Sequence, residues 1–169
     1  LNMCPELYDR TVVLNGVSKA YAMTGWRIGY AAGPEKLIAA MKKMQSQSTS
    51  NPTSIAQYAA VAALEGDQSF IEGATKAFKE RHDFVLQALR EIKGVECSPA
   101  QGTFYIFPYM QAAMERLDIS SDVEFGEFLI EKAGVALVPG SAFGSPGCMR
   151  ISFATTMENL EKSMARLQK

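Results

Sequence analysis

A lysine and an arginine, in surroundings that suit covalent chemistry, lie close together near the start of this 169-residue sequence. The stretch SKAYAMTGWRIGY, residues 18–30, contains Ser18, Lys19 and Arg27 together with two glycines and the single tryptophan. A lysine amine can form a Schiff base with a carbonyl compound if burial or a neighbouring cation lowers its pKa. The planar guanidinium of Arg27 suits a phosphate, to which the hydroxyl of Ser18 could add a further hydrogen bond.

Each of these residues also has an ordinary structural interpretation. From chemistry alone, a lysine such as Lys19 is more often a solvated surface residue, and Arg150, on an apolar run, fits either a structural ion pair or a carboxylate-binding site. The aromatic string Phe104–Phe107 is typical of a sheet core. His82, the only histidine, falls on the polar side of a predicted helix, where we expect it to be solvated, and no second histidine is present to form a metal site.

The elements that must position these residues alternate between strands and helices, which indicates an α/β fold. Short β-branched or aromatic runs predict strands at 11–15, 27–31, 103–107, 135–138 and 148–153. Helices are predicted from Pro34, over 54–65 with a Ser54-x-x-Gln57 capping box, over about 68–93, and after the boxes that open at Ser121 and Thr155. A lobe boundary is expected inside the long helix, near residues 76–90.

Composition excludes several classes of protein. Hydrophobic residues make up 47% and charged residues 21%, which are globular values. Lysine and arginine total 17 against 18 acidic residues, so no basic excess indicates nucleic-acid binding. No apolar run is long enough to predict a membrane span. The widely spaced Cys4, Cys97 and Cys148 predict reduced thiols and a cytoplasmic location.

Residues 18–30 resemble the cofactor-lysine signature of the class I aminotransferases, which are pyridoxal-phosphate enzymes of fold type I. The signature reads roughly S-K-x-[FY]-x-M-[TA]-G-W-R-[IVL]-G-[YW], and every position is met here. The resemblance continues in the family's order and covers essentially the whole chain. Within the family, the sequence resembles the bacterial aspartate aminotransferases, some of which also accept prephenate. The further matching segments are SQSTS at 46–50, GTFY at 102–105, VPGSAFG at 138–144 and RISFAT at 150–155.

This resemblance implies a role for each candidate residue. Lys19 would hold pyridoxal 5′-phosphate as a Schiff base and move the proton during amino transfer. Ser18 and Arg27 would bind the cofactor phosphate, and Arg150 would bind the substrate α-carboxylate. The substrates would be an amino acid, with aspartate as the expected one, and a 2-oxo acid. The enzyme would be a homodimer.

The resemblance also implies a division of the chain and an incomplete site. Residues 1–75 would be the end of the large cofactor-binding domain of fold type I, and residues 76–169 the small C-terminal α/β domain. Family members are more than twice this length, and the sequence opens at Leu1 in what reads as mid-chain sequence. The phosphate loop and the aspartate that pairs with the pyridine nitrogen would lie upstream, so we expect the 169 residues alone to be inactive.

Three alternatives stay open at this point. A C–S lyase or decarboxylase of the same fold type would share Lys19, Arg27 and Arg150. An aminotransferase-like sensor domain of a transcriptional regulator would bind the ligand without turning it over. An inactive fragment would do neither.

Overall fold

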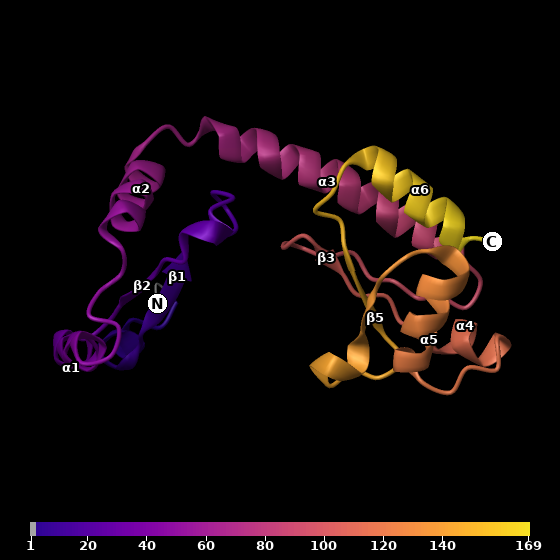
Figure 1. The fold of residues 1–169 in the computed structure, drawn as a ribbon, viewed down its shortest axis with the longest axis horizontal. Coiled ribbons are helices and arrows are strands. Elements are labelled where there is room, and N and C mark those ends of the chain that lie inside the picture. Colours follow the sequence, from indigo (N-terminus) through magenta and orange to yellow (C-terminus); the bar gives the residue numbers. More distant parts are fainter. Residues whose placement is uncertain (1–2) are drawn as a thin grey trace. The chain divides into compact units, whose positions relative to one another are not determined.

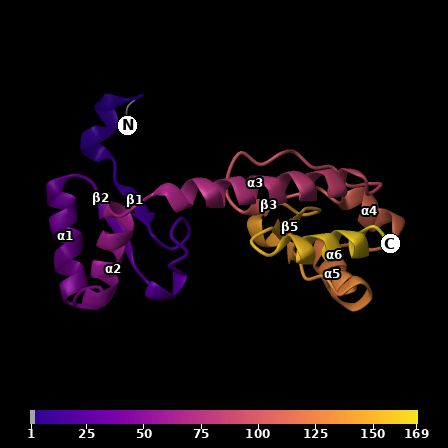
Figure 2. The same ribbon diagram turned by 90° about the horizontal axis from the view of Figure 1, so that it is seen from above.

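The computed structural model describes residues 3–169, and the chain divides into two compact units, Leu1–Glu72 and Gly73–Lys169, whose elements are drawn in Figures 1 and 2. Both units combine helices with antiparallel strands, which agrees with the predicted α/β character at that coarse level. Within residues 3–169, no helix is long and apolar enough to cross a membrane.

The first unit is built on one antiparallel strand pair with two helices after it. Strands β1 and β2 pair in the register Asn15↔Tyr30 and Gly16↔Gly29. Both strands begin and end later along the chain than the β-branched runs predict, because the pairing extends as far as these two glycines. The elements are η1 (Pro5–Arg10), β1 (Val13–Gly16), η2 (Thr24–Trp26), β2 (Gly29–Ala32), α1 (Glu35–Ser46) and α2 (Ser54–Glu65).

Helix α2 begins one residue earlier than the predicted cap at Ser54 implies. Its N-cap is Thr53, and Ser54 is the first helical residue, so the predicted capping box at Ser54 is wrong. The side chain of Gln57 turns back instead, and its Nε2 donates to the carbonyl of Pro52 at 2.8 Å. The helix ends at Gly66 as predicted, where an added Cβ would lie only 2.5 Å from the carbonyl oxygen of Ala62.

The second unit places a three-stranded antiparallel sheet, in the order β3-β5-β4, beside the long helix α3. The register pairs Tyr105 with Ser152 and Val138 with Arg150. The elements are α3 (Ser69–Arg90, which begins in the first unit), β3 (Tyr105–Ile106), α4 (Gln111–Arg116), α5 (Asp122–Phe128), η3 (Leu129–Ala133), β4 (Val138–Pro139), η4 (Gly140–Phe143), β5 (Met149–Ser152) and α6 (Met157–Leu167).

The main core of the protein lies in this second unit. Helix α3 contributes one apolar face to it, and β3, β5 and α6 cover that face. Fully burying an aliphatic or aromatic side chain contributes about 1.5 to 3 kcal/mol, so this face holds the unit together. Buried members of this core on α3, β3, β5 and α6, and directly after β5, include Val85, Leu89, Ile106, Met149, Ile151, Phe153, Leu160 and Met164.

The helix caps of this unit follow the predicted pattern with one shift. The Ser121 hydroxyl accepts from the backbone N–H of Glu124 at 3.2 Å, which confirms that cap. At α6 the capping residue is Thr156, whose Oγ1 accepts from the N–H of Asn159, rather than the predicted Thr155. The hydroxyl of Thr155 instead accepts from Nδ2 of the Asn159 side chain.

The thiol of Cys97 is half-buried beside the end of α3. Burial raises the pKa of Cys97, and the nearby Arg90 guanidinium only partly offsets this. Since the thiolate is the reactive form, we expect iodoacetamide to alkylate Cys97 about tenfold more slowly than the exposed Cys4. A time course read by peptide mass spectrometry, repeated in denaturant where the two rates should converge, checks this. Equal native rates would contradict it.

Candidate functional site

The cofactor-lysine stretch forms the connection between β1 and β2. The connection is a series of tight turns: the N–H of Ala22 donates to the carbonyl of Lys19 at 3.2 Å, and that of Met23 to the carbonyl of Ser18 at 3.1 Å. Val17, at 1% exposure, anchors the start of the connection in the first unit. Lys19 is exposed on this loop, and Ser18 is half-buried next to it.

Ser18 and Arg27 occupy matching positions on the two sides of this connection. Ser18 lies two residues after Gly16 and Arg27 two residues before Gly29, and Gly16 and Gly29 are the last strand pair. The strand register therefore brings a hydroxyl and a guanidinium to the same end of the pair, with the Lys19 amine on the same loop. This donor set fits a phosphate beside a lysine.

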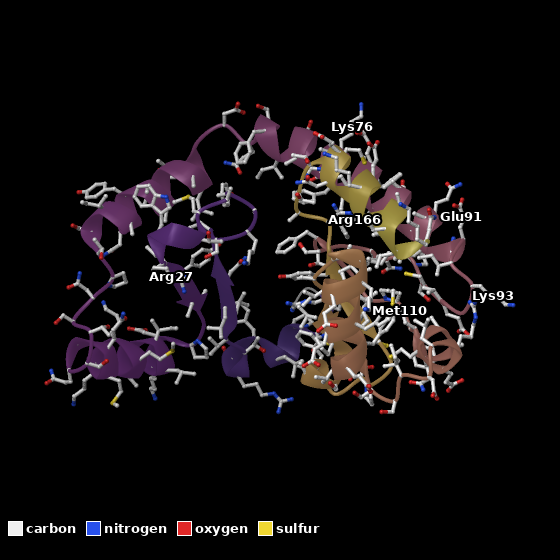
Figure 3. All side chains as sticks on the ribbon, turned by 45° about the vertical axis from the view of Figure 1, so that its right-hand side comes forward. Arg27, Lys76, Glu91, Lys93, Met110 and Arg166 are labelled. Atoms are coloured by element: carbon white, nitrogen blue, oxygen red, sulfur yellow. The ribbon has the colours of Figure 1, made fainter. Side chains whose placement is uncertain are left out.

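Arg27 has an unusual backbone conformation. Its φ of 50° and ψ of 48° lie in the left-handed region, where it caps η2. Figure 3 labels Arg27 among the side chains of the first unit. A residue with a Cβ pays roughly 1 to 2 kcal/mol to adopt this conformation. Its Nη1 donates to the carbonyl of Thr24 at 2.8 Å, which tethers the guanidinium of this exposed residue to its own turn. The sequence carried no signal for this conformation, which glycine or asparagine would normally mark.

Arg150 lies on β5 in the second unit, where two aromatic rings hold its side chain. Its guanidinium carbon is 4.4 Å from the ring centre of Tyr105 and 4.5 Å from that of Phe143. Tyr105 pairs with Ser152, two residues from Arg150, so both side chains lie on the same face of the sheet. Each of these stacked contacts contributes about 0.5 to 2 kcal/mol.

The guanidinium of Arg150 has no ion-pair partner among residues 3–169. A structural ion pair was one of the two interpretations left open for this residue. A half-buried arginine held between rings, with no carboxylate beside it, suits the recognition of a carboxylate from outside. Sequence reasoning missed Tyr105, because the aromatic string 104–107 was assigned to the sheet core, and it gave Phe143 no role beyond its place in a family-like segment.

His82 contradicts the sequence-based expectation most clearly. It was predicted to be solvated, yet it is only 7% exposed, and its Nε2 accepts a hydrogen bond from the backbone N–H of Ala100 at 2.9 Å. The residue lies on the buried stripe of α3, next to Val85 and Leu86 in helical spacing. Across the described part of the chain, no group of three or more histidine, cysteine or acidic side chains could hold a metal ion.

The structure thus brings Ser18, Lys19 and Arg27 together in one loop and holds Arg150 on the sheet of the other unit. Neither group explains by itself what the chain does, because a loop with a lysine, a hydroxyl and an arginine, and an arginine between two rings, are each compatible with many reactions. Comparison with known proteins supplies the context for both.

Residues 2–167 match the family model described as aminotransferase class I and II. The chain is 56% identical to the aspartate/prephenate aminotransferase of Nitrosomonas europaea and 48% identical to the aspartate aminotransferase of Geobacillus stearothermophilus. Each match covers 99% of this chain but only 44% and 42% of those relatives, so the chain spans less than half of their length.

The fold of the chain is also that of a solved relative. The crystal structure of the aspartate aminotransferase from Rhizobium meliloti superposes with a TM-score of 0.90 at 46% identity, over 97% of this chain and 42% of that one. A family match over nearly every residue, with this level of identity and structural agreement, leaves one assignment: the chain belongs to the class I and II aminotransferase family.

Proposed function

We propose that the protein containing this chain transfers an amino group between an amino acid, with aspartate as the expected one, and a 2-oxo acid. The observation that carries this proposal is the β1–β2 connection, where the Lys19 amine shares one loop with the Ser18 hydroxyl and the Arg27 guanidinium. Relatives named for aspartate or prephenate amino transfer support the substrate class. Enzymes of this family depend in general on pyridoxal phosphate, and the donor set of the loop fits that group.

Lys19 would perform the proton chemistry of the reaction. Lys19 is exposed on the loop, and its amine would condense with an aldehyde. In the reaction, Lys19 Nζ would act as the base that takes the proton from the substrate Cα and holds it for return during amino transfer. The cofactor, when bound, supplies the ring system that stabilises negative charge at the substrate Cα.

Ser18 and Arg27 would hold the cofactor phosphate, and Arg150 the substrate α-carboxylate. Arg150 suits this role because its guanidinium is oriented by Tyr105 and Phe143 rather than by an acidic partner. A planar fork held in one orientation can form two parallel hydrogen bonds to a carboxylate. The two arginines would therefore select the two anionic groups of the complex, phosphate and carboxylate.

The Arg27 assignment predicts a loss of cofactor affinity. In the whole protein, Arg27→Lys keeps the charge but loses the two-pronged contact, so the dissociation constant for pyridoxal phosphate should rise about 10- to 100-fold. Equilibrium dialysis measures this directly. Arg10→Lys, at an exposed arginine of η1, serves as the matched control and should leave the affinity unchanged. An unchanged affinity in Arg27→Lys would contradict the phosphate role.

The rest of the proposal concerns the protein as a whole. Residues 1–75 and 76–169 would form the end of the large domain and the small domain of fold type I, in a cytoplasmic homodimer. An exposed apolar stripe along α2 supports the idea that a longer chain covers it, because such stripes mark contact surfaces. Its members, at helical spacing, are Ile55, Tyr58, Val61 and Leu64.

Product analysis tests the proposed function. The complete gene product with pyridoxal phosphate should convert aspartate and 2-oxoglutarate into a keto acid and glutamate in equal amounts, whereas the 169 residues alone should show no steady turnover. Release of ammonia or carbon dioxide would favour a lyase or a decarboxylase. Ligand binding without any turnover would favour a sensor domain.

A further inference from the structure

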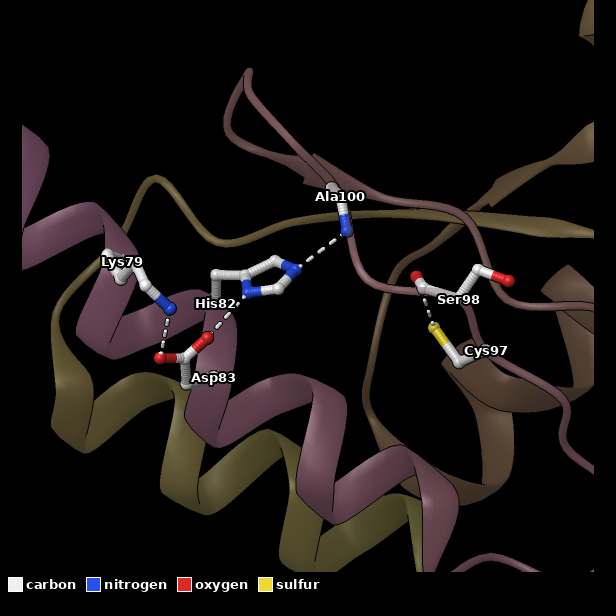
Figure 4. Close-up of polar contacts among 6 residues, drawn as sticks. All are labelled: Lys79, His82, Asp83, Cys97, Ser98 and Ala100. Atoms are coloured by element: carbon white, nitrogen blue, oxygen red, sulfur yellow. Dashed lines mark hydrogen bonds and ion pairs between the residues drawn. The ribbon is translucent and has the colours of Figure 1, made fainter.

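The buried His82 has both ring nitrogens engaged, as Figure 4 shows. Nε2 accepts from the backbone N–H of Ala100 at 2.9 Å, and Nδ1 lies 2.9 Å from Oδ1 of Asp83. A backbone amide can only donate, so Nε2 carries no hydrogen, and the ring proton is on Nδ1, which donates it to Asp83. The environment therefore selects one tautomer of His82.

Asp83 keeps the ring in this tautomer. Its carboxylate also accepts from Lys79 Nζ at 2.7 Å. The hydrogen bond from Lys79, and then that from His82, lower the pKa of Asp83, so the carboxylate stays charged at neutral pH and keeps accepting the Nδ1–H. Three residues of α3 thus direct one acceptor, Nε2, at the backbone of Ala100.

The segment that His82 holds leads directly into β3. Thr103, between Ala100 and β3, has a φ of 64°, a conformation that β-branched residues rarely adopt and that needs support from its surroundings. On its other side the His82 ring meets Phe153 edge-on at 5.8 Å between centres. The N–H of Phe153 in turn donates to the carbonyl of Phe104 at 2.9 Å. His82 therefore contacts both the segment before β3 and the residue after β5.

Strand β3 carries Tyr105, one of the two rings that orient Arg150, and β5 carries Arg150 itself. We propose that His82 is a positioning residue for Arg150: it fixes β3 against β5, and so fixes the Tyr105 ring against the guanidinium. The direction in which Arg150 presents its N–H groups to a carboxylate then depends on the Nε2 of His82. This inference rests on the role of Arg150 in the proposed function.

Two substitutions in the complete gene product separate this role from simple packing. His82→Leu keeps apolar volume but offers no acceptor, whereas His82→Gln keeps a side-chain acceptor for Ala100. With His82→Leu, KM for the amino acid should rise about tenfold, kcat should fall less, and the absorbance of the bound cofactor should persist. With His82→Gln, KM should stay within about threefold of wild type. Gln87→Leu, at an exposed position of the same helix, should change nothing.

Hydrogen exchange at the Ala100 amide supplies a readout that does not depend on activity. Exchange should be at least about tenfold faster in His82→Leu and close to the wild-type rate in His82→Gln. Equal rises of KM in both variants, or an unchanged KM in His82→Leu, would overturn the inference. A wild-type protein without transaminase activity would refute the proposed function instead, and exchange at Ala100 would still decide whether His82 holds this segment.

Discussion

Lys19→Ala in the complete gene product is expected to lower kcat for amino transfer by at least about a thousandfold. The reason is that a positioned proton-transfer group contributes typically 10²- to 10⁴-fold, and Lys19 is also the residue that would anchor the cofactor covalently. Cofactor absorbance should shift to that of the unattached aldehyde, while the Ser18 and Arg27 contacts retain part of the affinity. Stopped-flow and steady-state assays with aspartate and 2-oxoglutarate measure the loss.

Lys42→Ala is the matched control for this experiment. Lys42 is an exposed lysine of α1 in the same unit, and its removal should leave turnover and absorbance unchanged. If Lys19→Ala retained more than a tenth of wild-type turnover, another amine would have to carry the proton, and the assignment of Lys19 would be wrong.

Arg150→Lys should cost about 2 to 4 kcal/mol of transition-state binding, or about 30- to 900-fold in kcat/KM for the amino acid. Lysine keeps the positive charge but loses both the two-pronged contact with a carboxylate and the flat face that stacks on Tyr105 and Phe143. KM should rise and kcat should fall, while the cofactor stays bound.

Arg81→Lys tests whether any stacked arginine would behave in this way. The guanidinium of Arg81 also lies over an aromatic ring, 5.3 Å from the centre of Phe78, but we assign it no ligand. The Arg81→Lys variant should therefore retain wild-type kinetics. Unchanged turnover in Arg150→Lys together with loss of cofactor would instead make Arg150 a phosphate ligand.

Local sequence signals predicted much of the fold because they arise from local physics. The apolar spacing along α3 predicted a helix over about 68–93, and the structure has Ser69–Arg90. Gly94 ends this stretch because its φ is 87° and an added Cβ would meet the backbone nitrogen of Ala113 at 2.9 Å. Strand β3 is shorter than the predicted 103–107, because Thr103 turns left-handed before the pairing begins.

The arrangement around Arg150 could not be read from the sequence. Tyr105 and Arg150 are far apart in the chain, and only the register of β3 on β5 brings them to one face of the sheet. His82 is a different case, because its helical spacing from Val85 and Leu89 did indicate the buried stripe. The prediction placed His82 on the polar side of the helix, whereas in the structure the backbone amide of Ala100 satisfies the ring inside the core.

The most direct test of the account is borohydride reduction of the complete gene product loaded with pyridoxal phosphate, followed by peptide mapping. Reduction turns the bond between an amine and the cofactor into a stable link, so the labelled lysine is the one that holds the cofactor. We predict the label on the peptide that contains Lys19. A label on Lys36 or Lys42 instead, or no labelled lysine within residues 1–169, would contradict the account.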